Sequence, residues 1–291
     1  MVTPIHSDYS IDSESVERII HTFKVNQCAP FALGTTGESA SLKQQQKLAL
    51  IKSVVQSTDG QMPVFAGISS TSLLEAIDMG KQFSDLGAEV LVATLPYYYP
   101  ISPDEMTLFF EQLADEVDRP VILYNMPSLV RHSIPLEVAE RLSHHPNIQG
   151  MKDSERDAQR ITDSIRLWKD REDFAFYLGW AAKSAHSVLQ GADGIVPSTA
   201  NFVPDLYQQL YQAALDGQED LAFRLQQVTD DFSLIYQRNR PLNSSLPALK
   251  VLMHELGLCE TEVLPPLYHI VQDEQLQLIS ELRALMENMS G

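Results

Sequence analysis

The chain has 291 residues, with 39 acidic against 21 basic side chains and a formal net charge of -18. Such a charge repels phosphate backbones and anionic lipid, so we expect neither a nucleic-acid partner nor membrane binding. The length suits one barrel domain with a few added helices better than two average domains. The two cysteines, Cys28 and Cys259, lack metal-ligand spacing, and no stretch reaches the roughly 18 apolar residues of a membrane span. We therefore expect a cytoplasmic protein without disulfides.

Short apolar runs alternate with longer amphipathic stretches up to Val196, which is the pattern of a parallel α/β sheet. In chain order the predicted strands are Val2–Ile5, Pro30–Gly34, Met62–Gly67, Glu89–Thr94, Val121–Tyr124, Ile148–Lys152, Ala175–Gly179 and Gly194–Val196. Eight strands favour a (β/α)8 TIM barrel. A doubly wound open sheet would need a glycine-rich turn after the first strand, where the chain has His6–Tyr9.

Helices are expected between the strands. After Val203 the sequence predicts helices and no further strands. Ser41–Gln44 resembles a capping box at the start of one helix, and Ser102–Glu105 places a proline in the first turn of another. The helices predicted after Val203 are Asp205–Leu215, Glu219–Tyr236, Leu246–Leu256 and Asp273–Met289. We take residues 1–216 as the barrel and residues 217–291 as a C-terminal appendage of three helices.

Polar residues gather where four of the predicted strands end. The carboxyl ends of barrel strands share one face, so residues there converge on one pocket. The four segments are Gly34–Ser39, Pro96–Pro100, Tyr124–Pro127 and Gly150–Ser154.

Lys152 closes an apolar strand in the last of these segments. Burial disfavours the charged form of an amine, and a neutral amine attacks ketones. The resulting iminium is an electron sink, which allows a carbon–carbon bond to be made or broken without a metal. Alternatively, Lys152 extends its ammonium group to solvent or pairs with Asp153.

The other segments also allow two interpretations. Gly34–Ser39 offers backbone N–H groups and hydroxyls suited to a carboxylate, or is an ordinary turn before a helix. Tyr124 relays protons, or only fills the barrel interior. Tyr97–Tyr99 is more typical of an interface than of three catalytic groups. The eight histidines have no metal-ligand spacing, so no metal site is expected.

The chain resembles the dihydrodipicolinate synthase / N-acetylneuraminate lyase family of Schiff-base-forming barrels over nearly its whole length. Gly34–Ser39 matches the carboxylate-binding turn of the family, Ile122–Pro127 its tyrosine strand and Ile148–Asp153 its lysine strand. The resemblance implies that Lys152 is the Schiff-base lysine and Tyr124 the proton-shuttling tyrosine.

The resemblance also implies a carboxylate site at Thr35 and Thr36 and a backbone carbonyl contact from Val196. Tyr98 aligns with a tyrosine that crosses a dimer interface to join a Thr–Tyr–Tyr relay, and the family is typically a dimer of dimers. A homotetramer that acts on a small 2-oxo acid without a cofactor is thus expected. Its candidate catalytic residues are Lys152, Tyr124, Thr35 and Tyr98.

The substrate side departs from the family pattern. Leu129 stands where the synthases carry an arginine, and Arg131 stands where relatives usually have glycine. The sialic acid lyase branch has an acidic pair where this chain has Gly179–Ala182, and His145–Ser154 resembles the 4-hydroxy-2-oxoglutarate aldolase branch. Together these features favour retro-aldol cleavage of a short hydroxy- or deoxy-2-oxo acid to pyruvate and an aldehyde.

Leu129 and Trp180 would then line a largely uncharged outer pocket, with Ser154 and Ser198 as hydroxyl contacts. The alternatives are dihydrodipicolinate synthase, which condenses pyruvate with aspartate semialdehyde, and a catalytically inactive barrel that binds a 2-oxo acid.

Overall fold

The computed structural model describes residues 1–290, which form two compact units. The first unit comprises residues 1–62, 198–209 and the described residues from 224 onward. The second comprises residues 63–197 and 210–223. Helices α9 (Pro204–Leu215) and α10 (Glu219–Gln237) contribute residues to both.

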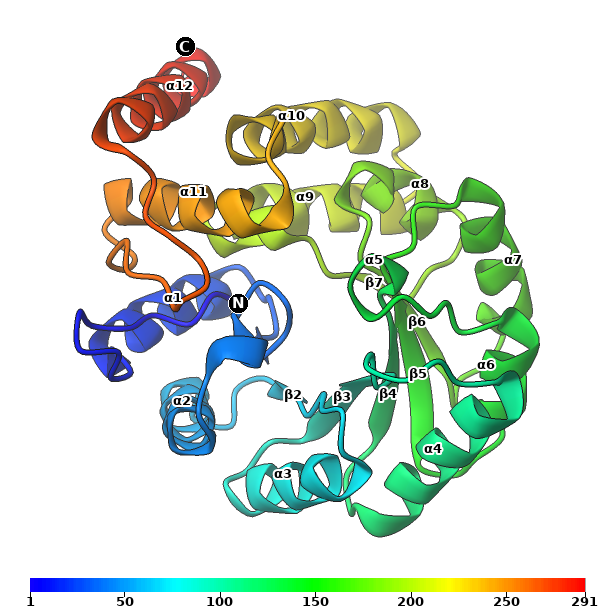
Figure 1. The fold of residues 1–291 in the computed structure, drawn as a ribbon. Coiled ribbons are helices and arrows are strands. Elements are labelled where there is room, and N and C mark those ends of the chain that lie inside the picture. Colours follow the sequence, from blue (N-terminus) through cyan, green and yellow to red (C-terminus); the bar gives the residue numbers. More distant parts are fainter. Residues whose placement is uncertain (291) are drawn as a thin grey trace. The chain divides into compact units, whose positions relative to one another are not determined.

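The second unit is built on parallel strands that pair in chain order (Figure 1). They are β2 (Phe65–Gly67), β3 (Val90–Thr94), β4 (Val121–Asn125), β5 (Ile148–Asp153), β6 (Ala175–Leu178) and β7 (Gly194–Ile195). The rings of Phe65 on β2 and Tyr177 on β6 meet edge to face, with centroids 6.1 Å apart. Since these strands are not neighbours, the sheet must curl.

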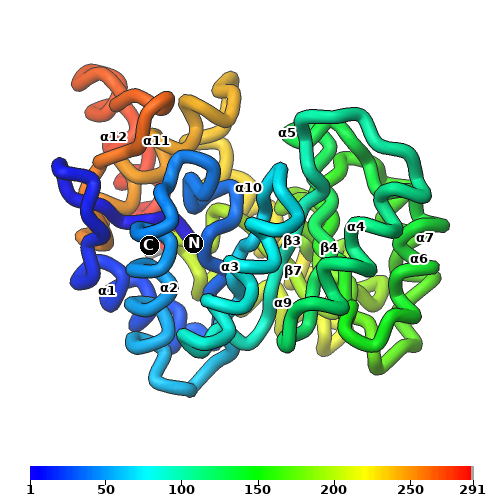
Figure 2. Tube along the Cα trace, turned by 60° about the horizontal axis from the view of Figure 1, so that its bottom comes forward, coloured from blue at the N-terminus to red at the C-terminus, as the bar shows by residue number. Residues whose placement is uncertain are grey.

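Helices connect the strands of this unit. They are α3 (Leu73–Asp85), α4 (Pro103–Glu116), α5 (Pro127–Val130), α6 (Leu136–Leu142), α7 (Ala158–Trp168) and α8 (Ser184–Leu189). In Figure 1, α4, α6 and α7 lie on the outer side of β4, β5 and β6. Figure 2 shows the short helix α5 beyond the carboxyl end of β4. The apolar faces of the long helices are buried, for example at Phe110 of α4 and Trp168 of α7, so the core lies between helices and sheet.

The first unit is mostly helical. It contains α1 (Ser13–Val25), β1 (Phe31–Ala32), α2 (Gln44–Thr58), α11 (Leu242–Glu255) and α12 (Gln272–Ser290), with short 3-10 turns η1 (Ser39–Ser41) and η3 (Ser198–Asn201). Helix α1 packs against α2, and α11 packs against α12. The predicted helices after Val203 are thus all present, although α11 begins four residues before the expected Leu246.

Two local predictions were wrong. Val2–Ile5 is not a strand, because its polar backbone groups bond elsewhere: the Val2 N–H donates to the Asn201 side chain at 2.8 Å, and Ile5 forms only an isolated antiparallel bridge with Ile11. The described residues therefore contain seven strands rather than eight. Helix α2 is capped at Lys43, whose N–H donates to the Gln46 side chain at 2.8 Å, and not at Ser41, which lies in η1.

The proline predicted in the first turn of the helix after Ser102 is confirmed, and the structure adds a capping box there. The Ser102 hydroxyl accepts the Glu105 N–H at 3.3 Å, and the Glu105 carboxylate accepts the Ser102 N–H at 2.7 Å. Pro103 occupies the first turn of α4, where its missing N–H costs no hydrogen bond.

Candidate functional site

Lys152 and Tyr124 lie side by side near the carboxyl ends of β5 and β4. They are register partners, and the Lys152 Nζ is 3.9 Å from the centroid of the Tyr124 ring. Both are buried, with exposed fractions of 8% and 4%. Register partners on parallel strands face the same side of the sheet, so an amine and a phenol are held together in a largely dry environment.

The same row across the sheet contains two residues that the sequence did not single out. Thr94 of β3 is the register partner of Tyr124, and Tyr177 of β6 is the partner of Lys152. Burial, assisted by the Asp193 carboxylate, raises the pKa of Tyr177, so its phenol stays protonated near neutral pH. The strand-end position of Thr94 was visible in the sequence, but the register that aligns it with Tyr124 was not.

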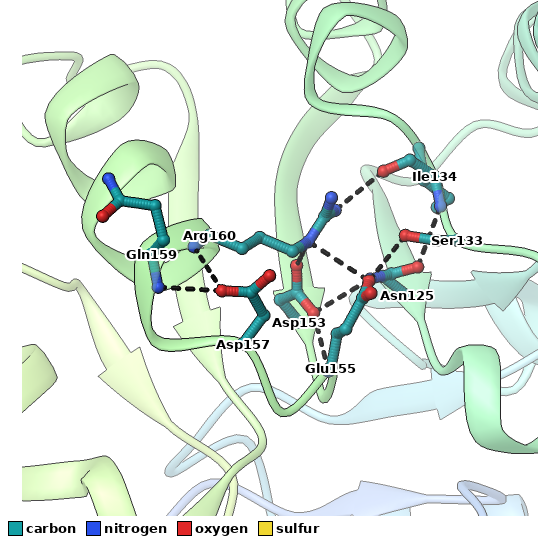
Figure 3. A network of polar contacts seen from close by, with 8 residues as sticks. All are labelled: Asn125, Ser133, Ile134, Asp153, Glu155, Asp157, Gln159 and Arg160. Carbon is teal, nitrogen blue, oxygen red and sulfur yellow. Dashed lines mark hydrogen bonds and ion pairs between the residues drawn. The ribbon is translucent and has the colours of Figure 1, made fainter.

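A polar network connects Asn125 and Asp153, the strand residues that directly follow Tyr124 and Lys152 (Figure 3). Asn125, next to Tyr124, donates to the carboxylates of Asp153 at 3.0 Å and Glu155 at 2.9 Å. The Nε of Arg160 donates to Asp153 at 2.6 Å. Burial raises the pKa of Asp153, and the neighbouring Arg160 guanidinium opposes that shift. The Asp153 carboxylate thus bonds to Asn125 and Arg160. Successive residues of a strand point to opposite faces of the sheet, so Asp153 lies on the face opposite to Lys152.

The network also holds the segment that follows α5. The Ile134 N–H donates to the Asn125 side chain at 3.0 Å, and the Ile134 carbonyl accepts from Arg160 at 2.7 Å. The Ser133 hydroxyl donates to Glu155 at 2.5 Å. The chain after α5 is therefore tied to the residues that flank Tyr124 and Lys152.

Ser154 and Trp180, two of the residues expected around an outer pocket, have different neighbours. The Ser154 N–H donates to the Asn125 carbonyl at 2.9 Å, and the Ser154 hydroxyl occupies the space that a side chain at Gly179 would fill. Trp180 has the Lys183 ammonium 5.8 Å from a ring centroid, a cation that the sequence interpretation overlooked. The surroundings of Trp180 are therefore not fully uncharged.

Leu129 lies on α5 and is 42% exposed. Arg131 directly follows this helix, is exposed, and has a left-handed backbone with φ 61°. A non-glycine residue in this region costs on the order of 1 kcal/mol, which gives a physical reason for glycine at such a position.

Tyr97, Tyr98 and Tyr99 form an exposed aromatic cluster after β3, with exposed fractions of 53%, 73% and 72%. The Tyr98 and Tyr99 rings pack edge to face, and a His132 ring nitrogen lies 3.1 Å from the Tyr99 carbonyl oxygen. Such a cluster is typical of an interaction surface. The interface role of Tyr98 stays a prediction.

The expected carboxylate-binding turn follows β1 in the first unit. Its backbone closes through hydrogen bonds from Gly37 N–H to the Gly34 carbonyl and from Glu38 N–H to the Thr35 carbonyl, both 3.1 Å. Thr35 and Thr36 are half-buried. Leu33 before them and Glu38 after them have left-handed backbones, with φ 58° and 55°. The 3-10 turn η1, rather than α2, comes directly after this turn.

Val196 and Ser198 follow β7. The Val196 N–H donates to the Leu178 carbonyl at 2.8 Å, which extends the pairing of β7 with β6. In the first unit, the Ser198 hydroxyl is 2.6 Å from the hydroxyl of Tyr236. Burial raises the pKa of Tyr236, so the two hydroxyls form a neutral pair. The sequence pattern pointed to Ser198 but not to its partner on α10.

Within residues 1–290, no group of three or more His, Cys, Asp or Glu side chains is arranged to hold a metal ion. No helix in that range combines the length and apolar character needed to cross a membrane.

The chain is similar to proteins with two different named activities. The model of the dihydrodipicolinate synthetase family matches residues 1–285. A 4-hydroxy-tetrahydrodipicolinate synthase of Laribacter hongkongensis is 34% identical over 226 residues, 77% of each chain. The probable 2-dehydro-3-deoxy-D-pentonate aldolase YjhH of Escherichia coli K12 is 32% identical over 267 residues, 90% of this chain and 87% of that protein.

A solved structure has the same fold. Dihydrodipicolinate synthase from Bacteroides thetaiotaomicron matches with a TM-score of 0.93 at 32% identity, over 98% of this chain and 96% of that one. The predicted fold class, an α/β TIM barrel with a C-terminal helical part, is thereby confirmed, although the described residues form seven strands and not eight.

Proposed function

The chain belongs to the dihydrodipicolinate synthetase family and is a lyase-type enzyme, and we propose that Lys152 forms a Schiff base with pyruvate or a related 2-oxo acid. The observation that carries this proposal is the buried contact between the Lys152 amine and Tyr124, with 3.9 Å between Nζ and ring centroid. A buried amine beside a phenol combines a nucleophile with a proton donor.

The proposed cycle begins when the Lys152 amine attacks the C2 carbonyl of the substrate and water leaves, which forms an iminium. Loss of the proton from the C4 hydroxyl then breaks the C3–C4 bond, and the electron pair moves to the iminium nitrogen as an aldehyde departs. Protonation of the enamine at C3 and hydrolysis of the imine release pyruvate. Tyr124 carries protons in these steps, while Thr35 and Thr36 bind the substrate carboxylate.

We further propose that the physiological direction is cleavage of a short hydroxy- or deoxy-2-oxo acid. With Leu129 in place of arginine, the carboxylate of aspartate semialdehyde lacks a bidentate partner, which costs about 2–4 kcal/mol of binding. The aldolase name of a relative that matches 90% of this chain supports the same direction.

Synthesis of a dihydrodipicolinate precursor is the second candidate. Two observations favour it: the synthase names of relatives, and Arg131, which is exposed two residues from Leu129. In this case the Arg131 guanidinium would replace the missing arginine as the partner of the second carboxylate.

Steady-state kinetics separate the two candidates. We would compare cleavage of 4-hydroxy-2-oxoglutarate, 2-oxo-3-deoxygluconate and N-acetylneuraminate with condensation of pyruvate and aspartate semialdehyde. We expect cleavage of a short acid to be the most efficient reaction, and Leu129→Arg to increase condensation. Condensation as the best reaction, with kcat/KM of about 10⁴ M⁻¹s⁻¹ or more, would refute the cleavage proposal. Loss of that activity in Arg131→Ala would then assign the carboxylate contact to Arg131.

The exposed aromatic cluster supports a proposal on assembly. We propose that Tyr97–Tyr99 lies at a dimer interface in a homotetramer, with Tyr98 reaching the partner's site. Tyr98→Ala should then lower the sedimentation coefficient, because the tetramer dissociates into smaller species. A variant that stays tetrameric would contradict the proposal that the cluster lies at the interface.

A further inference from the structure

The turn that carries Thr35 and Thr36 ends in a buried ion pair. The Glu38 Oε1 is 2.6 Å from the Nζ of Lys250 on α11, and each side chain is only 1% exposed. The Lys250 ammonium also donates to the carbonyls of Thr3 at 2.9 Å and Glu262 at 2.6 Å. The other Glu38 carboxylate oxygen accepts the Leu264 N–H at 2.7 Å, so the ammonium has three acceptors and each carboxylate oxygen has a donor.

A contribution to the free energy of unfolding does not by itself explain this buried pair. Removing two charges from water is costly, and replacing a buried ion pair with apolar groups is often neutral or stabilising. A fully satisfied polar cluster instead fixes one arrangement of the segments that it joins. Here it joins four segments that are distant in sequence: the N-terminal segment at Thr3, the turn at Glu38, helix α11, and the segment from Glu262 to Leu264.

Among these four segments, the turn at Glu38 has a backbone conformation that needs support from its surroundings. Glu38 has a left-handed backbone with φ 55°, which is unfavourable for a residue with a side chain and persists only when the surroundings impose it. A second anchor acts on the preceding residue, because the Thr3 hydroxyl donates to the Gly37 carbonyl at 2.6 Å. The two anchors hold the residues that directly follow Thr36.

We propose that Glu38 and Lys250 are positioning residues for the carboxylate-binding turn, so that capture of the 2-oxo acid depends on helix α11. The inference rests on the proposed function, because it assigns Thr35 and Thr36 to the substrate carboxylate. Neither Glu38 nor Lys250 touches the substrate. Their effect is on binding, through the conformation of the turn, and not on the reaction at Lys152.

The test uses a double variant, Glu38→Gln with Lys250→Met. The new glutamine amide oxygen can still accept the Leu264 N–H, and the double variant contains no buried unpaired charge. The Thr3 and Glu262 carbonyls lose the Lys250 donor, so thermal denaturation first checks that the variant is folded. Borohydride trapping of the pyruvate adduct is measured against pyruvate concentration, which separates half-saturation from the rate at saturation. We expect half-saturating pyruvate to rise about 10-fold or more while the saturated rate changes less than about 3-fold.

Glu274→Gln is the matched control. It breaks the ion pair between Arg240 and Glu274 of α12, 2.7 Å long, which lies in the same unit but not at the turn. Both trapping parameters should stay at their wild-type values in this control. A folded double variant with wild-type half-saturation overturns the inference, whereas a wild-type protein that forms no adduct overturns the proposed function instead.

Hydrogen exchange on the wild-type protein tests the inference without any substitution. Since binding and local order are reciprocally linked, saturating pyruvate should slow exchange at Gly37 and Glu38 and also at the Leu264 amide, which bonds to Glu38. Peptides from α12 should show no change. Protection of the turn without protection at Leu264 would show that the pair does not couple the two segments, and would overturn the inference.

Discussion

Tyr124 is the residue whose hydroxyl the proposed cycle needs for proton transfer. Tyr124→Phe keeps the ring, whose centroid is 3.9 Å from the Lys152 Nζ, and removes only the hydroxyl. We expect turnover to fall by roughly 100-fold or more. The melting temperature should change little, and borohydride should still trap pyruvate on Lys152 because the amine remains. Steady-state kinetics and thermal denaturation check this, and near-normal turnover would reduce Tyr124 to a packing residue.

Single residues of the site were predictable where they end a strand. Lys152 and Tyr124 stand at the ends of apolar runs, and barrel geometry brings such ends together. Thr94 and Tyr177, their register partners, were not found, because register depends on pairing between distant strands rather than on a local pattern. The catalytic and binding roles assigned to these residues stay predictions.

Among the elements, the connection from β5 to α7 depends on the ion pair between Asp153 and Arg160. The side chains are 2% and 11% exposed. Arg160→Met would leave the Asp153 carboxylate buried with one partner fewer, so we expect a loss of about 3 kcal/mol in the free energy of unfolding. Arg156→Met, at an exposed position of the same connection, should change it by less than about 0.5 kcal/mol. Urea denaturation measures both, and equal effects would contradict this role of the pair.

The connection after β6 depends on the absence of a side chain at Gly179. An added Cβ would overlap the Ser154 Oγ and lie 3.2 Å from the Asp153 carbonyl oxygen. Gly179→Ala should therefore cost about 1–3 kcal/mol of stability and displace the Ser154 hydroxyl. Adding Ser154→Ala should recover much of that stability. If the double variant were no more stable than the single one, the clash would lie with the backbone instead.

Most elements were predictable because their apolar periodicity is strong, as in β3, β4 and α10. The two failures have different physical causes. Val2–Ile5 has the apolar composition of a strand, but the partners of its backbone, Asn201 and Lys250, lie 199 and 247 residues away. Helix α2 starts where the Gln46 side chain caps Lys43, a competition with Ser41 that composition alone does not resolve.

For the whole molecule, the α/β class and the family could be predicted, since short motifs in the right order carry both. Long-range polar contacts could not. Glu38 and Lys250 belong to residue types that are rarely fully buried, yet each side chain is 1% exposed. The predicted boundary between residues 216 and 217 stays a prediction, as does the tetramer, because both depend on contacts that no local pattern encodes.

The most direct test of the central claim is peptide mapping after borohydride reduction of the protein in pyruvate. We predict a reduced pyruvate adduct on the peptide that contains Lys152, and none in Lys152→Ala or Lys152→Arg, since a guanidinium stays charged and cannot attack the ketone. An adduct on another lysine of the folded protein, with Lys152 unmodified, would contradict the account.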